Sequence, residues 1–382
     1  MNPGQGIFCP WPNFGVKQLT SSAPPVAISP VRRSDFVLKP YAQSSNARAA
    51  AQLLNTLVPY GLLWVLLANI PSQAPLLALP VLALMVLFSA RCFSLMHDCG
   101  HYALFESRGL NRAAGFLFGI VNAIPQYPWS RGHAFHHKHN GDWDMYKGPS
   151  ALVTTEEYES YSPFGKWFYA FLRHPLMLFP GGFFYLIIKP RLALLLGSFD
   201  FLGHGAQQLR QQGLAAFPGM IKSYKSKHWY TAAEFWDILF NNIGVIAVWL
   251  LMGAWLGHGR FWISYSTVMT LSAAIFICIF FVQHNYEGSY AHRTEGWSYD
   301  RGAIEGSSYL KLPAIFNWFS ADIGCHNIHH LSEFIPNYNL RACHERNAHL
   351  LSNVRVLTMG DIPSCFRYIL WNRQADSLEV IP

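Results

Sequence analysis

Histidines gather in three short clusters of the sequence, and their spacing suits metal binding. The first cluster is a His-Asp-Cys-Gly-His run at 97–101, and the other two are His-x-x-His-His units at 133–137 and 326–330. Eight of the 17 histidines of the chain fall within these segments. Neutral imidazole is a strong ligand for iron, zinc, copper and nickel. The clusters therefore predict a metal site.

Helical geometry gives this spacing a meaning. Residues four apart share a helix face, and positions one, four and five of a His-x-x-His-His unit lie within about 100° on a helical wheel. We therefore expect each cluster to project its rings toward one point. Asp98 and Asn285 are candidates for hydrogen-bonding the second ring nitrogen of a ligand and fixing its tautomer.

His284 is a ninth candidate ligand, because it follows the end of an apolar stretch at the depth expected for His97. A single metal ion takes three or four protein ligands, so nine imidazoles predict two metal ions. Neutral nitrogen ligands leave such a pair with a high positive charge, which suits O₂ activation. The predicted ligands are His97, His101, His133, His136, His137, His284, His326, His329 and His330.

The remaining histidines have no partner within a cluster, and we interpret them as ordinary core or surface residues. A Phe-Pro-Gly-Gly run at 179–182 resembles the His-Pro-Gly-Gly haem motif of cytochrome b5, but the histidine is missing. No fused haem donor is therefore expected, and electrons must come from an external partner. The histidines outside the clusters are His139, His174, His204, His228, His258, His292, His344 and His349.

The composition predicts that a membrane positions these clusters. Hydrophobic residues make up 51% of the chain and charged residues 13%, about half the charge of an average soluble domain. The seven cysteines are odd in number and form no Cys-x-x-Cys pair, which argues against a secreted disulfide scaffold. The formal charge is +7, but no run of five basic residues occurs, so nucleic acid is not an expected partner.

Four apolar stretches of about 20 residues can each form a helix of roughly 30 Å, the thickness of a hydrocarbon core. Short connectors join them in pairs, at 71–74 and 258–261, so we expect an all-α integral membrane protein with two helical hairpins. Lys and Arg are concentrated in the N-terminal arm and in residues 97–237, which predicts a cytosolic, histidine-bearing helical cap. The predicted transmembrane spans are 49–70, 75–96, 238–257 and 262–282.

Residues 176–196 are predicted to form an interfacial or re-entrant helix. The apolar part is too short to span, and the Pro-Gly-Gly run interrupts it. A single crossing there would also place the histidine clusters on opposite faces of the membrane. The expected organisation is a cytosolic arm at 1–45, a membrane domain at 46–345 and a cytosolic tail at 346–382.

These residues resemble the membrane-bound fatty acid desaturases, especially the acyl-lipid Δ12/ω-3 type of bacteria, cyanobacteria and plants. The resemblance covers roughly residues 35–345. The first cluster with the following Tyr-Ala-Leu-Phe, and the third with the following Ile-Pro-Asn-Tyr-Asn-Leu at 335–340, are similar to that subgroup's motifs. The stretches 281–287 and 306–309 match as well. The sequence that follows the second cluster, at 138–147, departs from the pattern usual in this family, and this departure bears on the substrate and the regiochemistry.

The resemblance implies a non-haem centre of two iron ions, O₂ as co-substrate and two electrons for each double bond. It implies that the eight clustered histidines and His284 are the iron ligands, and that a cis double bond enters an acyl chain on a lipid or other acyl carrier. The expected donor is a ferredoxin or cytochrome b5 type protein, docked on the cytosolic side of a bacterial inner membrane or of an endoplasmic reticulum or plastid membrane. Aromatic residues near the clusters are candidates for lining an acyl channel, namely Tyr127, Trp129, Phe135, Trp318 and Phe319.

Two alternatives stay open at this stage. Related membrane hydroxylases, ketolases and alkane monooxygenases use similar histidine clusters and insert oxygen instead of removing a second hydrogen. A histidine-rich metal transporter or sensor is the non-enzyme alternative. It predicts polar residues along a path through the spans, whereas the four spans hold only Asn, Gln, Ser, Thr and Arg91 as polar residues.

Overall fold

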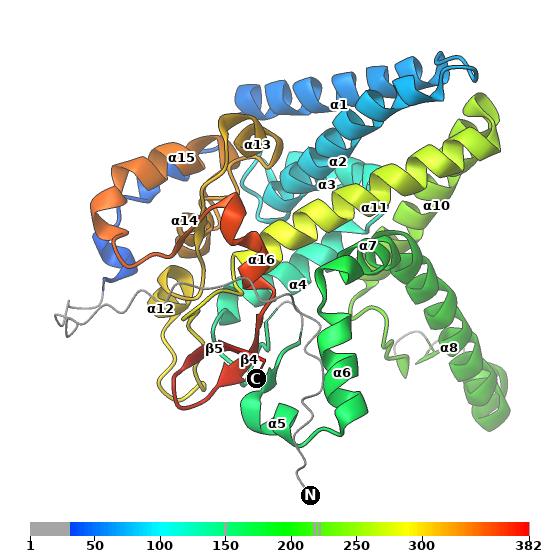
Figure 1. Cartoon of the computed structure of the whole chain (residues 1–382). Helices are drawn as coiled ribbons and strands as arrows, with labels where there is room; N and C mark the ends of the chain where they lie inside the picture. The colour runs from blue at the N-terminus through cyan, green and yellow to red at the C-terminus, as the bar shows by residue number, and fades with distance from the viewer. Residues whose placement is uncertain (1–30, 149–150, 217–218, 221–222, 382) are drawn as a thin grey trace, which may run out of the picture.

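The computed structural model describes residues 31–148, 151–216, 219–220 and 223–381, and the chain is mostly helical (Figure 1). Most of the predicted N-terminal arm, residues 1–30, lies outside the described residues. Within the described residues, five helical stretches are long and apolar enough to cross a membrane, judged by length and composition. They are α1 (Asn46–Ala68), Pro75–Gly100 with α2 (Ala78–Gly100), Pro175–Ala216, α10 (Ala232–Leu256) and α11 (His258–Val282).

Four of these stretches form the two predicted hairpins. The second connector is shorter than predicted, because residues 258–261 form the first turn of α11 instead of a loop. Gly257 has φ +80°, a conformation that glycine adopts without steric cost, and it reverses the chain in a single residue. In Figure 1 the two hairpin turns lie on one side of the molecule, while α4 and α14 lie toward the other.

The fifth stretch is longer than the sequence predicted. It comprises α7 (Leu178–Phe183), a π-helical segment (Phe184–Ile188) and α8 (Lys189–Gln212). Pro180 does not interrupt α7, because it lies in the first turn, where a backbone N–H has no partner within the helix. Pro190 cannot donate to the carbonyl of Leu186, but Arg191 donates to that oxygen at 3.0 Å and satisfies it. In Figure 1, α8 runs in a different direction from α10 and α11.

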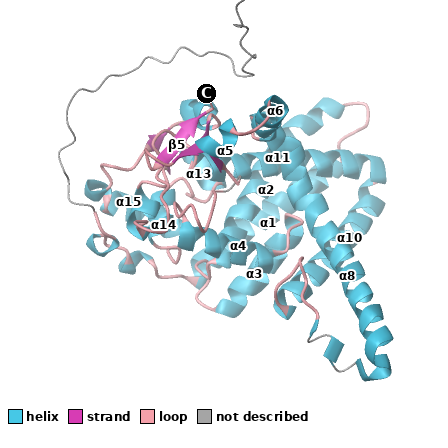
Figure 2. Cartoon of the chain, turned by 90° about the horizontal axis from the view of Figure 1, so that it is seen from below, coloured by secondary structure: helices cyan, strands magenta, loops and turns pink. Residues whose placement is uncertain are grey.

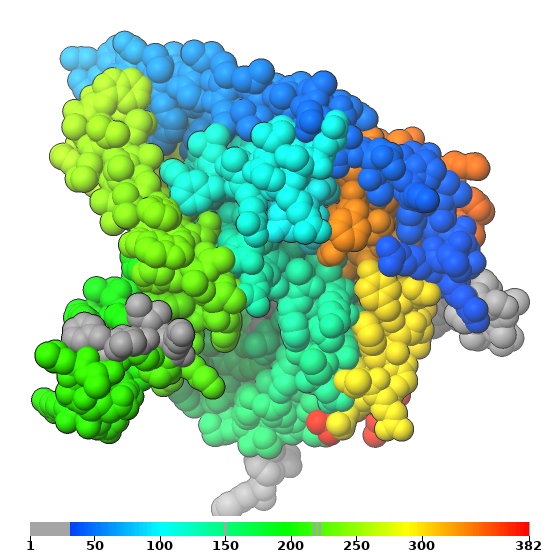
Figure 3. Space-filling view, turned by 180° about the vertical axis from the view of Figure 1, so that it is seen from behind, coloured from blue at the N-terminus to red at the C-terminus, as the bar shows by residue number. Residues whose placement is uncertain are grey.

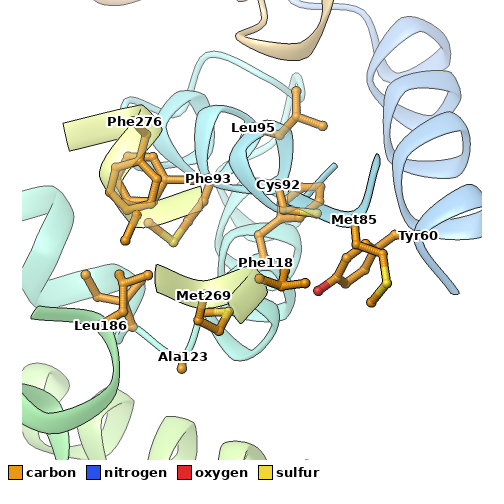
Figure 4. Close-up of a cluster of buried hydrophobic side chains, with 14 of the residues drawn as sticks. Tyr60, Met85, Cys92, Phe93, Leu95, Phe118, Ala123, Leu186, Met269 and Phe276 are labelled. Carbon is orange, nitrogen blue, oxygen red and sulfur yellow. The ribbon is translucent and has the colours of Figure 1, made fainter. Parts of the chain in front are cut away.

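The membrane helices share a core in which α2 is central, packed against α1 and α11 (Figure 4). The rings of Phe93 and Phe276 stack with 3.7 Å between their centroids. Near the cap, the buried Arg91 donates from Nε to Thr56 on α1 at 2.9 Å, and its guanidinium lies 3.9 Å from the ring centroid of Trp318. These contacts hold the end of α2, and therefore His97 and His101, in place.

The remaining helices and strands form the cap, which carries the other histidines. Its longer helices are α3 (Arg108–Val121), α4 (Gln126–His139), α6 (Pro163–Leu172) and α15 (Asn337–Arg346). Its short α-helices are α5 (Thr155–Glu159), α12 (Tyr299–Ile304), α13 (Ala314–Phe319), α14 (His326–Leu331) and α16 (Ile362–Cys365). Short 3₁₀ helices of the cap occupy Arg33–Asp35, Lys39–Tyr41, Ala348–Leu350 and Met359–Asp361. Those within the long apolar stretches occupy Pro75–Leu77, Pro175–Met177 and Gly213–Ala216.

Two small sheets, which the sequence did not predict, stabilise the cap (Figure 2). In the first sheet, β1 pairs in parallel with β4, and β4 pairs antiparallel with β5; in the second, β2 pairs in parallel with β3. The strands are β1 (Val153–Thr154), β2 (Tyr309–Leu310), β3 (Val356–Leu357), β4 (Tyr368–Asn372) and β5 (Ser377–Val380).

The last strands join the predicted tail to the cap. Trp371 on β4 is buried, stacks on Trp143 with 4.4 Å between centroids, and donates from its ring N–H to the carbonyl of Ala291 at 2.9 Å. Buried aromatic rings contribute a large share of packing energy. The domain boundary at 345 stays a prediction, but residues 346–381 pack into the cap.

Candidate metal centre

The nine predicted histidines come together in two neighbouring groups. One group has five histidines and the other has four, and within each group the ligand nitrogens lie within 4.8 Å of one another. The five histidines come from α4, α14, and α2 with its C-terminal cap. None of the histidines that we interpreted as ordinary residues belongs to either group, among the described residues. The five-histidine group is His97, His101, His133, His137 and His329. The four-histidine group is His136, His284, His326 and His330.

The division between the groups corrects one expectation. The rings of a His-x-x-His-His unit do not converge on one point, because the unit contributes to both groups. His133 and His137, four residues apart, face one group, while His136 faces the other. Adjacent helical residues diverge by about 100°, whereas residues four apart differ by about 40°. Each of α4 and α14 therefore contributes histidines to both groups. The ring centroids of His137, in the five-histidine group, and His330, in the four-histidine group, lie 4.2 Å apart.

Several ring nitrogens face each other at the spacing of metal ligands. The Nε2 atom of His284 lies 3.1 Å from that of His136 and 2.9 Å from that of His326, and the Nε2 atom of His137 lies 3.0 Å from those of His133 and His329. Two nitrogens bound at right angles, each about 2.1 Å from one ion, would be separated by about 3.0 Å.

Unpaired ring nitrogens give a second test of the fit to metal. The Nε2 atoms of His97 and His101 are buried and have no hydrogen-bond partner. Both ring nitrogens of His330 are also buried and without a partner. A buried polar atom without a partner is costly, and a metal ion would satisfy these nitrogens. The residues present therefore fit a pair of metal ions, five imidazoles around one position and four around the other.

Burial keeps several of these rings neutral and able to donate a lone pair. It lowers the pKa of His284 to about 4. Burial, followed by repulsion between neighbouring rings, also holds the pKa of His133, His137 and His329 well below the usual value. The neutral imidazole is the form that binds metal.

Carboxylates contact only the edge of the five-histidine group, within the part of the chain that the structure describes. Asp98, on α2, lies 3.3 Å from Nδ1 of His97 and also accepts from the backbone and side-chain amides of Asn337 at 2.7 and 2.8 Å. Glu333 lies 3.2 Å from Nδ1 of His101. Such partners orient a ligating ring and raise its basicity.

Two of these orienting contacts were not predicted. Glu333 follows the third cluster, but α14 ends at Leu331, so helical spacing gives no signal for its position. The backbone carbonyl of Gly306 accepts from Nδ1 of His284 at 2.8 Å, and a carbonyl leaves no signature in the sequence. The side-chain amide of Asn285 donates to the carbonyl of Tyr368 at 3.0 Å, and its predicted role beside a ligand stays a prediction.

A cavity of about 760 Å³ opens beside the two groups, within the usual size of ligand sites. His133, His136 and His284 form part of its wall, and most of the remaining lining is apolar. Figure 3 shows a hollow on the surface beside the segment that contains α4. Tyr185 and Trp129 also line the cavity. The ring of Trp129 stacks on that of His133, with 4.9 Å between centroids.

Four other aromatic residues that we expected to line a channel are found in different contacts. Trp318 and Phe319 pack on Phe88, with ring centroids 5.9 and 5.2 Å away, and Phe135 packs on His139 at 4.5 Å. Arg112 lies over the ring of Tyr127 at 5.3 Å. The cavity is lined instead by aromatic residues within the apolar helices, namely Phe93, Phe276 and Phe280.

The fold and the histidine groups define a helical, multi-pass membrane protein whose buried imidazoles can bind metal. Residues 72–359 match the sequence profile of the family described as "Fatty acid desaturase". The chain belongs to the fatty acid desaturase family, whose members are oxidoreductases.

Individual relatives support this assignment. A protein named "Fatty acid desaturase" from Bacillus subtilis (strain 168) is 29% identical over 345 residues, which cover 89% of each chain. The "sn-1 oleoyl-lipid 12-desaturase" of a Picosynechococcus species is 27% identical, over 65% of this chain and 62% of the relative. The "Acyl-lipid omega-3 desaturase (cytochrome b5), endoplasmic reticulum" of Arabidopsis thaliana is 26% identical, over 71% of this chain and 64% of the relative. Relatives with Δ12 and ω-3 names are thus more distant than the Bacillus protein.

Proposed function

We propose that this protein is an O₂-dependent acyl-lipid desaturase that introduces a cis double bond, of the Δ12 or ω-3 type, through a centre of two iron ions. The observation that carries the proposal is the apolar cavity, whose wall includes His133, His136 and His284. A flexible apolar chain in this cavity would lie directly against the groups of imidazoles.

The overall reaction balances as R–CH₂–CH₂–R′ + O₂ + 2 e⁻ + 2 H⁺ → R–CH=CH–R′ + 2 H₂O. Two iron ions, when bound, would supply the oxidising power that removes the two hydrogens. The protein would supply positioning, because aligning a substrate bond with the reacting centre can account for much of the rate. Phe93, Phe276 and Phe280 would hold the methylenes and exclude water. Asp98, Glu333 and the carbonyl of Gly306 would fix the ring orientations of His97, His101 and His284.

We also propose a cytosolic position for the cap, on the basis of the basic residues that flank the spans. The two electrons would come from an external ferredoxin or cytochrome b5 type donor. Two relatives support this choice of donor, since "ferredoxin" and "cytochrome b5" occur in their names. A bacterial inner membrane would place the site beside both the donor and the acyl lipid.

Expression in a host that lacks the double bond, followed by gas chromatography of its fatty acids, tests this function. We expect a new unsaturated chain in cells with the wild-type protein and none with the His329→Ala variant, which loses one ligand of the five-histidine group. The product must also depend on O₂. Identical fatty acids in both strains across a broad substrate panel, or a hydroxylated product instead of an alkene, would contradict the proposal.

The variant Glu333→Gln tests the orienting contact on His101. The amide oxygen can still accept from Nδ1–H of His101, but the negative charge is lost, so we expect roughly ten-fold faster loss of iron to a chelator. Glu287→Gln is a matched control, because Glu287 is exposed and lies 3.6 Å from Arg355. Retention of iron by Glu333→Gln equal to that of the control would show that the carboxylate does not support the centre.

A further inference from the structure

The Phe-Pro-Gly-Gly run at 179–182 lacks the histidine of a haem motif, but it has a place in the structure. Gly181 and Gly182 belong to α7 and both line the cavity beside the histidine groups. The two glycines meet different surroundings. Their lack of side chains therefore has two separate consequences.

Gly182 allows α7 to pack closely on α11. A Cβ atom at this position would lie 2.7 Å from the Cβ of Ala273, closer than two unbonded carbon atoms can approach without repulsion. Gly182 is buried. Its role is to bring the two helices together and so to form one side of the cavity.

Gly181 is turned about 100° around the helix from Gly182. A Cβ atom at this position would meet no heavy atom within 4 Å. Gly181 is exposed and lines the cavity, so the space that a side chain would occupy belongs to the cavity or its mouth. Gly132 on α4, directly before His133, has the same two properties.

The contact with Ala273 shows how far this space lies from the histidines. Ala273 precedes the end of α11, Val282, by about 13 Å of helix, and His284 follows just beyond that end. This distance is close to half the thickness of a hydrocarbon core, about 15 Å. The cavity therefore extends from the imidazoles along α11 to the glycine pair.

We propose that Gly181 sets the length of acyl chain that the cavity accepts, by leaving the part remote from the histidines unfilled. This inference rests on the proposed function, since it assigns a specificity-determining residue to the same site. A larger side chain at 181 would occupy space that the far methylenes of a long chain need. Shorter chains, which do not reach that far, would be affected less.

Binding tests the proposal without reference to catalysis. Doxyl-labelled stearate, an 18-carbon chain, can be titrated into purified wild-type, Gly181→Leu and Gly203→Leu proteins, and the immobilised fraction measured by electron paramagnetic resonance. Gly203 is the matched control, because it lies on α8 in the same helical stretch, is exposed like Gly181 and has no heavy atom within 4 Å of its added Cβ, but is not part of the cavity lining. We expect about ten-fold weaker binding for Gly181→Leu and wild-type binding for Gly203→Leu. Equal binding by all three proteins would overturn the proposal.

Product analysis gives a second readout. In cells supplied with 14- and 18-carbon chains, Gly181→Leu should lower the yield of 18-carbon relative to 14-carbon unsaturated product, while Gly203→Leu leaves the ratio unchanged. An unchanged ratio in Gly181→Leu would contradict the inference. Absence of any unsaturated product from the wild-type protein would contradict the proposed function instead, and the stearate titration would still decide the role of Gly181.

Discussion

Replacement of His284 by Ala should abolish desaturation and remove one of the two metal ions. His284 is the only member of the four-histidine group from outside the three clusters, and its Nε2 atom lies within 3.1 Å of Nε2 on both His136 and His326. Without it, three imidazoles remain to hold the ion. Loss of even an orienting residue costs 10–100-fold in metal affinity or activity, so we expect the loss of a ligand to lower product yield by more than about 100-fold. Iron content should fall from about two ions per chain toward one.

His292→Ala is the matched control for this variant. His292 lies outside both groups, and its ring nitrogen Nε2 is 3.4 Å from a carboxylate oxygen of Asp376. Its replacement should leave iron content and product yield unchanged. Full iron content and full product yield in His284→Ala would show that His284 is not a metal ligand. This result would contradict a second metal position that the four-histidine group holds.

Replacement of Asp98 by Ala should weaken both the fold and the metal site. Asp98 is buried and accepts two N–H groups of Asn337 in addition to its contact with His97. Its removal leaves buried donors without acceptors, at a cost of about 1–3 kcal/mol each. It also frees the His97 ring to reorient, which should lower iron affinity by about 10–100-fold. We expect a lower thermal midpoint in detergent and a lower iron content per chain.

The variant Asp98→Asn separates the two effects, because it keeps the size of the side chain and one acceptor oxygen. It should fold better than Asp98→Ala and still lose iron. Asp144→Ala is the control, since Asp144 lies at the surface and pairs with Arg293 at 3.0 Å. An Asp98→Asn protein that retains iron as strongly as the wild type would show that the carboxylate serves only the packing of α15.

The sequence was a good guide to which histidines come together but a weaker guide to their grouping. Histidine is distinctive, and its spacing in the clusters restricts which helix face it occupies, so the nine predicted rings do come together. The split of each His-x-x-His-His unit between two groups depends on where α4 and α14 lie relative to each other. Tertiary packing decides that arrangement, and local periodicity does not encode it.

Long apolar helices were predictable because a bilayer requires about 20 apolar residues in a row. The continuation of the fifth stretch to Ala216 was not, because Pro180 and Pro190 usually indicate a break. Pro180 is tolerated because it lies in the first turn of α7. Pro190 is tolerated because the side chain of Arg191 donates to the carbonyl of Leu186. The pairings of β1 with β4 and of β2 with β3 were missed for a similar reason, since the paired strands are distant in sequence.

Iron content and iron coordination in the purified wild-type protein test the central claim most directly. We expect about two iron ions per chain by mass spectrometry, with an X-ray absorption spectrum dominated by nitrogen ligands at about 2.1 Å. One iron ion or none after full loading, or a coordination shell dominated by oxygen or sulfur, would contradict a two-ion centre built from these imidazoles.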